Sequence, residues 1–141
     1  MGLVIQYVFV LVLLIIFSIK DIQTRTVPWR WVMASVLGTI LIRCFYSPEP
    51  WWHYLLTGLC ILLGLLMISI SLKDQLGGGD IQLFGWLGLS LGFYSALFVL
   101  IGTLLLTIVY GLIRKRTFPV VPFMLISFMT LLIMEWKVGA L

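Results

Sequence analysis

The chain has 141 residues, of which 62% are hydrophobic and 10% are charged, and its formal net charge at pH 7 is +4. This apolarity excludes an ordinary soluble domain, because stretches of about 18 or more apolar residues are typical of transmembrane helices. The basic residues stand in small clusters beside the apolar stretches, a pattern of membrane topology and not of a nucleic-acid-binding face. We therefore expect one membrane-embedded domain over residues 1–141, surrounded by a lipid bilayer and without a nucleic acid partner.

Hydropathy predicts an all-α polytopic bundle of about six transmembrane helices. The apolar segments are 2–19, 30–46, 54–72, 81–91, 93–113 and 119–136. A single helix over 81–113 would be about 50 Å long, well beyond a hydrocarbon core of about 30 Å. We therefore expect an interruption at Gly88, at Gly92 or at the Leu91-Gly92-Phe93 step, and the short helix before it to cross or nearly cross the membrane.

The charges predict the orientation of this bundle, because Lys and Arg collect in cytoplasmic connections. With the N-terminus outside, seven of the nine basic residues fall inside: Lys20, Arg25, Arg30, Lys73, Arg114, Lys115 and Arg116. Only Arg43 and Lys137 fall outside. This orientation places Asp21 and Asp80 on the same side of the membrane.

Asp21 stands at the end of the first apolar segment, in the polar run from residue 19 to the helix-starting Pro28. An ionisable side chain near hydrocarbon costs roughly 2.5–3.5 kcal/mol, so it is a functional candidate by default. The alternative is an ordinary cytoplasmic loop in which Asp21 offsets the charges of Lys20 and Arg25. Taken alone, this segment favours the ordinary loop.

Asp80 follows three consecutive glycines, Gly77, Gly78 and Gly79, at the start of an apolar segment. Glycines permit backbone conformations and close approaches that side chains forbid. The alternative role is that of a helix N-cap, in which the carboxylate accepts from free backbone N–H groups. Asp21 and Asp80 together supply the pair of carboxylates that an aspartic protease needs, since two adjacent carboxylates cannot both ionise easily.

The remaining residues that could bind metal give no such pattern. Cys44 and Cys60 stand singly in apolar segments, so we expect buried side chains and neither a zinc site nor a disulfide. His53, the only histidine, stands among aromatic residues at a predicted membrane interface, where an anchoring role is expected. We expect no metal and no organic cofactor.

Three motifs in order give the chain a family resemblance. They are Asp-Ile-Gln-Thr-Arg-Thr-Val-Pro from Asp21, Gly-Gly-Gly-Asp-Ile-Gln-Leu from Gly77, and Phe-Pro-Val-Val-Pro-Phe over 118–123. The set resembles the type IV prepilin peptidases, which are integral-membrane aspartic proteases with a GxGD motif. The resemblance implies that Asp21 and Asp80 are catalytic and that Gly77, Gly78 and Gly79 form the active-site loop. It also implies cleavage of the leader peptide from prepilins or pseudopilins at the cytoplasmic side of the bacterial inner membrane, in type IV pilus or type II secretion systems.

Two departures from this family change the expected chemistry. Many members carry a lysine two residues after the GxGD aspartate, and here Gln82 stands there, so help from a cation is lost or passes to Lys73. The paired CxxC motifs associated with N-methylation are missing, so we expect no N-methyltransferase activity. Asp74 forms an ordinary solvated pair with Lys73 or attracts the basic leader of the substrate, so Lys73, Asp74 and Gln82 are possible substrate contacts.

Two functions of other classes stay open beside the peptidase. A non-enzymatic assembly subunit of a pilus or secretion system would keep the fold and tolerate loss of either carboxylate. A small proton-coupled or ion-coupled transporter component would use acidic residues near the middle of the membrane, commonly within an internal repeat. The sequence shows no repeat and places both aspartates at the ends of apolar segments, which makes the transporter the least favoured reading.

Overall fold

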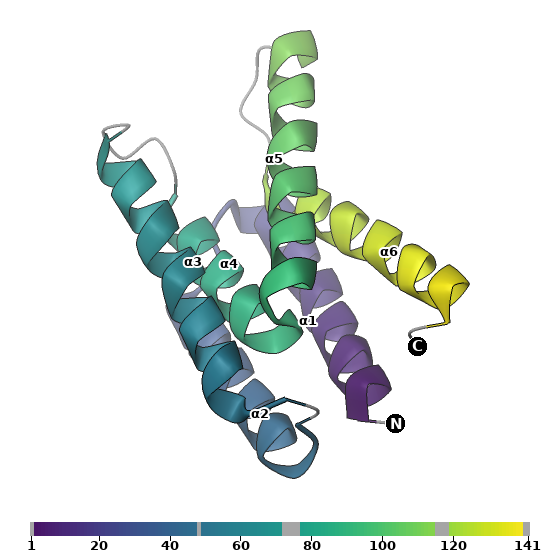
Figure 1. Ribbon diagram of the computed structural model, residues 1–141. Coiled ribbons are helices and arrows are strands. Elements are labelled where there is room, and N and C mark those ends of the chain that lie inside the picture. Colours follow the sequence, from purple (N-terminus) through teal and green to yellow (C-terminus); the bar gives the residue numbers. More distant parts are fainter. Residues whose placement is uncertain (1, 48, 72–76, 115–118, 140–141) are drawn as a thin grey trace.

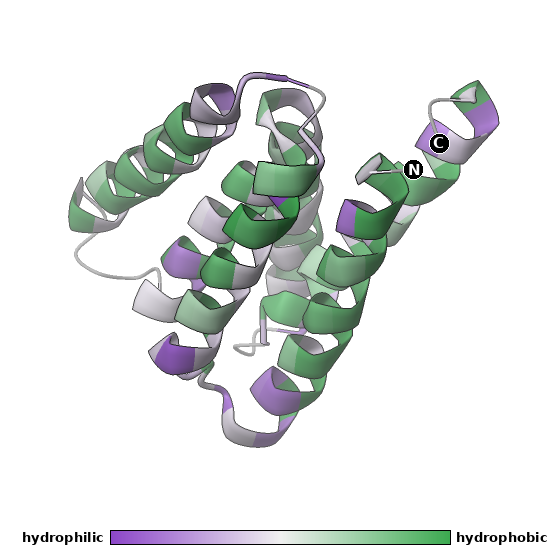
Figure 2. Cartoon of the chain, turned by 90° about the horizontal axis from the view of Figure 1, so that it is seen from below, coloured by the Kyte–Doolittle hydropathy of each residue, from purple (hydrophilic) through white to green (hydrophobic). Residues whose placement is uncertain are grey.

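The computed structural model describes residues 2–47, 49–71, 77–114 and 119–139, and over these ranges it consists of six α-helices without a strand. The helices are α1 (Gly2–Thr24), α2 (Trp29–Phe45), α3 (Trp51–Ser71), α4 (Gly78–Leu91), α5 (Phe93–Arg114) and α6 (Val121–Val138), and Figure 1 shows their arrangement. The beginning of α1 and the last turns of α6 lie at the same end of the bundle, where Tyr7 contacts Glu135 (Figures 1 and 2). The predicted all-α bundle is confirmed.

The helices also have the length and composition of a multi-pass membrane protein. Within the described ranges, α1, α3, α5 and α6 are each long and apolar enough to cross a membrane. The other two are shorter, with 17 residues in α2 and 14 in α4. Many large hydrophobic side chains are exposed on the outside of the helices, and Figure 2 shows how hydrophobic residues dominate the chain. A hydrocarbon environment is the one in which such a surface is stable.

The short helix α4 is the centre of the bundle and packs against α1, α2, α3 and α5. Nine of its 14 residues are buried, including Trp86 and Leu87. Its closest approach is to α3, where a Cβ atom added to Gly88 would lie 3.1 Å from the Cα of Gly58. Small residues at such a crossing allow two backbones to approach closely in a membrane protein.

Gly92 divides the long apolar stretch into α4 and α5, at one of the predicted places. Its φ of 84° lies in the left-handed region that glycine adopts without strain. The Gly92 N–H donates to the Gly88 carbonyl at 3.1 Å, and the Gly92 carbonyl accepts from the Ala96 N–H at 3.0 Å. The chain therefore turns within one residue while its backbone groups stay hydrogen-bonded.

Two sequence expectations are corrected. The first helix does not end near residue 19 but continues to Thr24, so Asp21 belongs to a helix and not to a loop. Cys44 and Cys60 are exposed on the outer surface, although we expected them to be buried. In a membrane bundle, hydropathy does not distinguish a side chain that faces lipid from one that faces another helix, because both surroundings are apolar.

Candidate active site

Asp21 is directed into the bundle because it continues the buried face of α1. Leu14, Phe17, Ser18 and Asp21 are all buried, and their spacing of three and four residues keeps them on one side of the helix. Asp21 is only 6% exposed. The helix ends just beyond it at Arg25, whose φ is 53° and whose N–H donates to the Asp21 carbonyl at 2.8 Å.

Asp80 lies in the first turn of α4, behind the glycine run. Gly77 is the N-cap residue, and its carbonyl accepts from the N–H of Asp80 at 3.1 Å and of Ile81 at 3.3 Å. The predicted alternative, in which Asp80 is the N-cap residue, is therefore wrong. Asp80 is the third residue of the helix, where its partly buried carboxylate lies beside Gly77.

The three glycines stand in different surroundings. A Cβ atom on Gly77 would lie 3.3 Å from the Asp80 carboxylate, whereas nothing lies within 4 Å of the corresponding position at Gly78. At Gly79 the nearest atom is the Val27 carbonyl oxygen, 3.9 Å away, in the connection between α1 and α2. Of the three glycines, only Gly77 lies against the carboxylate, which would have to shift by a few tenths of an ångström to admit a methyl group there.

The two aspartates lie within electrostatic reach of each other. Burial, and next the negative charge of Asp21, raise the pKa of Asp80 from 3.8 to about 6. Burial removes water from a carboxylate and a neighbouring like charge opposes its ionisation, so the two effects act in the same direction. The fold thus brings together two carboxylates that are 59 positions apart in the sequence and favours a state in which they share a proton.

The first turn of α6 completes this group. The Val121 N–H donates to Oδ2 of Asp21 at 3.2 Å, in a buried hydrogen bond. This contact was not predicted from the sequence, in which residues 118–123 stood out only as part of a family motif. The signal available in the sequence was Pro122, because proline is favoured in the first turn of a helix, where free N–H groups gather.

The other residues expected near the site have different outcomes. Gln82 is exposed on α4 and lines a groove. Lys73 and Asp74 lie outside the described residues. Lys20 does not pair with Asp21, and its ammonium group lies over the Trp31 ring, 4.9 Å from the centroid.

The groove that Gln82 lines runs between α2, α3 and α4. Its volume is about 620 Å³ and its lining is mostly apolar. Each helix contributes four residues spaced i, i+3, i+4 and i+7: Trp29, Val32, Met33 and Val36; Leu55, Gly58, Leu59 and Leu62; Gln82, Gly85, Trp86 and Leu89. Three parallel stripes of this spacing form a trough of about two helical turns.

A family comparison matches these observations. The model of the type IV leader peptidase family matches residues 8–112, a range that includes both aspartates and the glycine run. The chain belongs to the type IV leader peptidase family. No curated protein and no solved structure was found to match it.

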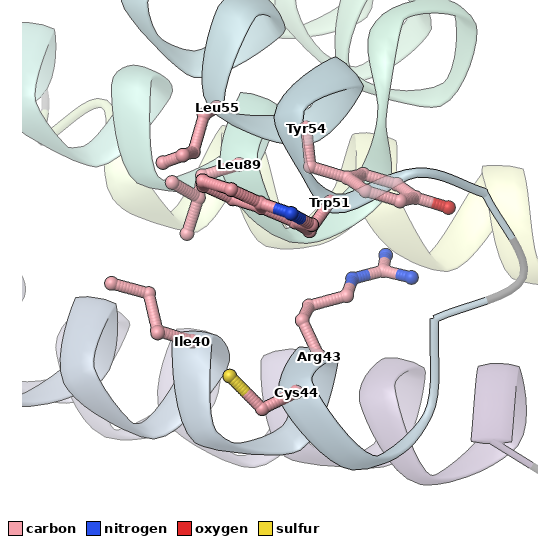
Figure 3. Close-up of a pocket in the computed structure, with 7 residues that line it drawn as sticks. All are labelled: Ile40, Arg43, Cys44, Trp51, Tyr54, Leu55 and Leu89. Atoms are coloured by element: carbon pink, nitrogen blue, oxygen red, sulfur yellow. The ribbon is translucent and has the colours of Figure 1, made fainter.

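In this type IV leader peptidase family member, the end of the bundle opposite the two aspartates has a different character. There Arg43 is buried, its guanidinium lies 3.7 Å from the Tyr54 ring centroid, and its Nη2 donates to the Ser90 carbonyl. Figure 3 shows the guanidinium beneath the Tyr54 ring, at one edge of an apolar pocket of about 200 Å³. Thr39 joins the same cluster by accepting from Trp86 Nε1 at 2.9 Å.

Glu135 anchors a second polar contact at that opposite end. Its Oε1 accepts from the Tyr7 hydroxyl at 3.0 Å and from the Ser95 hydroxyl at 3.3 Å, which joins α1, α5 and α6. Fourteen residues separate Tyr7 from Asp21 along α1, about 21 Å at about 1.5 Å per residue. Nowhere in the described ranges do three or more His, Cys, Asp or Glu side chains gather closely enough to hold a metal ion.

Proposed function

We propose that this chain is an aspartic endopeptidase that removes the leader peptide from type IV prepilins or pseudopilins. The observation that carries the proposal is the pair formed by Asp21 and Asp80, in which the pKa of Asp80 is raised to about 6. A carboxylic acid and a carboxylate in one site can act together on a peptide bond. The family membership supports leader peptidase activity in general, and the carboxylate pair is what favours the aspartic type.

The reaction needs only the two aspartates and a water molecule. The ionised aspartate takes a proton from water as the water oxygen attacks the scissile carbonyl carbon, and the protonated aspartate donates to the carbonyl oxygen. The tetrahedral intermediate then collapses, its carbon–nitrogen bond breaks, and the leaving amine takes up a proton. Both aspartates return to their starting states, so neither a metal nor an organic cofactor enters the proposed chemistry.

The groove between α2, α3 and α4 supports a place for the hydrophobic helix of the substrate. It is apolar, and Gln82, two residues after Asp80 on α4, is among the residues that line it. A substrate helix lying in the groove would pack against the same short helix, α4, that carries Asp80. The seven basic residues of the predicted inner connections support a cytoplasmic position for this end of the bundle in the bacterial inner membrane.

Cysteine crosslinking tests this placement in a background in which Cys44 and Cys60 are replaced by alanine. We expect Met33→Cys and Leu59→Cys, both in the groove, to crosslink to a cysteine in the hydrophobic helix of a prepilin. Leu105→Cys on α5 is the matched control, because Leu105 is 57% exposed and lies outside the groove. Crosslinking of Leu105→Cys alone would place the substrate on α5 instead.

The decisive experiment is cleavage of a co-expressed prepilin by the wild type, Asp21→Asn and Asp80→Asn, with the membrane abundance of each variant measured by immunoblot. We expect the wild type to process the prepilin and both variants to lose processing at normal abundance. Unchanged processing by either variant would remove that aspartate from the mechanism. A wild type that assembles with pilus components but cleaves no prepilin would favour the assembly subunit.

A further inference from the structure

The hydrogen bond from α6 to Asp21 makes the two aspartates unequal. Val120 is the N-cap of α6, so Val121 is the first residue of the helix and its N–H has no acceptor within the helix. The Val120 carbonyl accepts from the N–H groups of Phe123 and Met124, both at 3.1 Å. Pro122 has no N–H to offer. The Val121 N–H is therefore free to donate its hydrogen bond to the Asp21 carboxylate.

A buried N–H donor stabilises an ionised carboxylate, and the positive end of the α6 dipole acts in the same direction. Asp80 lacks such a donor, because no described residue donates a hydrogen bond to its carboxylate. The dipole of α4 favours its charge, but burial and the charge of Asp21 outweigh that effect and raise the pKa of Asp80 to about 6. Burial also disfavours the charged form of Asp21, and the Val121 N–H offsets part of that cost.

No other described charge reverses this difference. Among the described residues, the other charged side chains at this end of the bundle are Lys20 and Arg25 at the end of α1, Arg30 on α2 and Arg114 on α5. The first turn of α6 and the last described turn of α3 carry no charged residue. Lys20 lies over Trp31, and Arg25, Arg30 and Arg114 are exposed to the surroundings of the bundle.

We propose that the first turn of α6 assigns the roles of the two aspartates: the Val121 N–H holds Asp21 as the ionised base, and Asp80 carries the proton. This inference rests on the proposed function and goes beyond it by making Val121 a positioning residue. In the first step Asp21 takes a proton from water, the water oxygen bonds to the carbonyl carbon, and Asp80 protonates the carbonyl oxygen. In the second step Asp21 gives its proton to the leaving nitrogen, the carbon–nitrogen bond breaks, and Asp80 regains a proton from the intermediate.

An amide-to-ester replacement at position 121 tests the assignment. The valine is replaced by its α-hydroxy acid, which removes the N–H and keeps the side chain, and kcat/KM for a prepilin peptide is measured against pH in nanodiscs. We expect the acidic limb of the profile, which reports ionisation of the base, to move to higher pH by roughly one to two units, the effect expected for loss of a hydrogen bond to a charged group. A shift of the alkaline limb instead would make Asp21 the acid and overturn the assignment.

Two matched controls separate the hydrogen bond from the packing of this turn. Val121→Ala keeps the N–H and loses the side chain, so it should keep the wild-type pH limbs. The same ester at Met124 removes an N–H that donates to Val120 and not to Asp21, so it should also keep them. An acidic limb that moves equally with the Met124 ester would overturn the proposal in favour of a general effect of loosening the turn.

A measurement without catalysis covers the case in which the ester at position 121 does not fold. Infrared spectra of protein labelled with ¹³C-carboxyl aspartate are recorded against pH for Asp80→Asn and for Asp21→Asn. We expect the remaining Asp21 to ionise at lower pH than the remaining Asp80, and the reverse order would overturn the proposal. If the wild type is active and the position 121 ester has the same pH profile, only the assignment of roles is wrong. If both Asp21→Asn and Asp80→Asn still cleave the prepilin, the proposed function itself is wrong.

Discussion

The two ends of the bundle treat buried polar groups in opposite ways. At one end, Asp21 and Asp80 lie within electrostatic reach of each other, with the Val121 N–H as the hydrogen-bond donor to Asp21. At the other end, the Glu135 carboxylate accepts from two hydroxyl groups, and the Arg43 guanidinium lies against an aromatic ring and donates to a carbonyl. Breaking a buried polar contact is costly because it leaves the other group without its partner, whereas two carboxylates held together store unfavourable energy that can serve catalysis. The comparison predicts that the first end controls activity and the second controls stability.

The largest expected effect comes from removing one carboxylate at each end. Asp80→Asn should lower the rate of prepilin cleavage by about 10³-fold or more, because general acid–base catalysis contributes on the order of 10²–10⁴. Glu135→Gln should leave cleavage by the folded protein within about twofold of the wild type. Initial rates in detergent or nanodiscs at equal protein concentration measure both. A comparable loss of activity in Glu135→Gln would end the functional contrast between the two ends.

The same carboxylate should destabilise the folded protein when it is ionised. Because the pKa of Asp80 is raised from 3.8 to about 6, the folded state keeps a proton that the unfolded state loses, so stability falls as pH rises through this window. Asp80→Asn should therefore raise the free energy of unfolding at pH 7.5 by up to about 3 kcal/mol relative to wild type, and by much less at pH 4. Thermal unfolding at both pH values measures the difference. Equal effects at the two pH values would show that the gain does not come from the charge.

At the opposite end, Tyr7→Phe should destabilise the protein by about 1–3 kcal/mol, because Glu135 loses its shorter hydrogen bond. Its effect on cleavage by the folded protein should be small. Tyr94→Phe is the control, since Tyr94 is 86% exposed, and its cost should stay within about 0.5 kcal/mol. Unfolding in detergent compares the three proteins. Equal stabilities of the two variants would mean that the Tyr7 hydroxyl contributes nothing beyond its ring.

The smallest expected effect tests the fit of the glycine run around Asp80. Gly77→Ala places a methyl group 3.3 Å from the Asp80 carboxylate and should lower kcat several-fold, because small displacements of a catalytic group are costly. Gly78→Ala meets open space and should cost less. Neither Gly77 nor Gly78 has a positive φ, so an alanine at either position introduces no backbone strain and the two variants can be compared directly. A larger loss in Gly78→Ala would mean that the substrate, and not Asp80, needs the space.

Much of this structure could be predicted from local features of the sequence. An interruption of the apolar stretch 81–113 follows from length, since the stretch is too long for one membrane crossing, and Gly92, where it occurs, was one of the expected places. Asp80 was expected at a helix start because glycines precede it, and it lies in the first turn of α4. The predicted N-cap was wrong by three residues, because Gly77 and not Asp80 is the N-cap residue, which leaves the Asp80 carboxylate free.

Local features failed where the answer depended on which face of a helix meets another helix. Asp21 was expected in a loop because the apolar residues stop before it, but packing of the last turn of α1 against the bundle extends the helix to Thr24. Cys44 and Cys60 were expected to be buried, and both face outward. Apolar side chains suit lipid and protein interior equally well, so composition cannot choose between the two.

The sequence by itself determined the membrane-embedded helices, the glycine run and the two aspartates, because hydropathy and backbone freedom are properties of neighbouring residues. Only the tertiary structure decided that α6 returns to Asp21 across 100 positions, that Tyr7 meets Glu135 across 128, and that α2, α3 and α4 leave an apolar groove between them. These contacts depend on the directions in which whole helices pack. The difference between the two aspartates therefore arises from the fold, although the aspartates themselves can be read in the sequence.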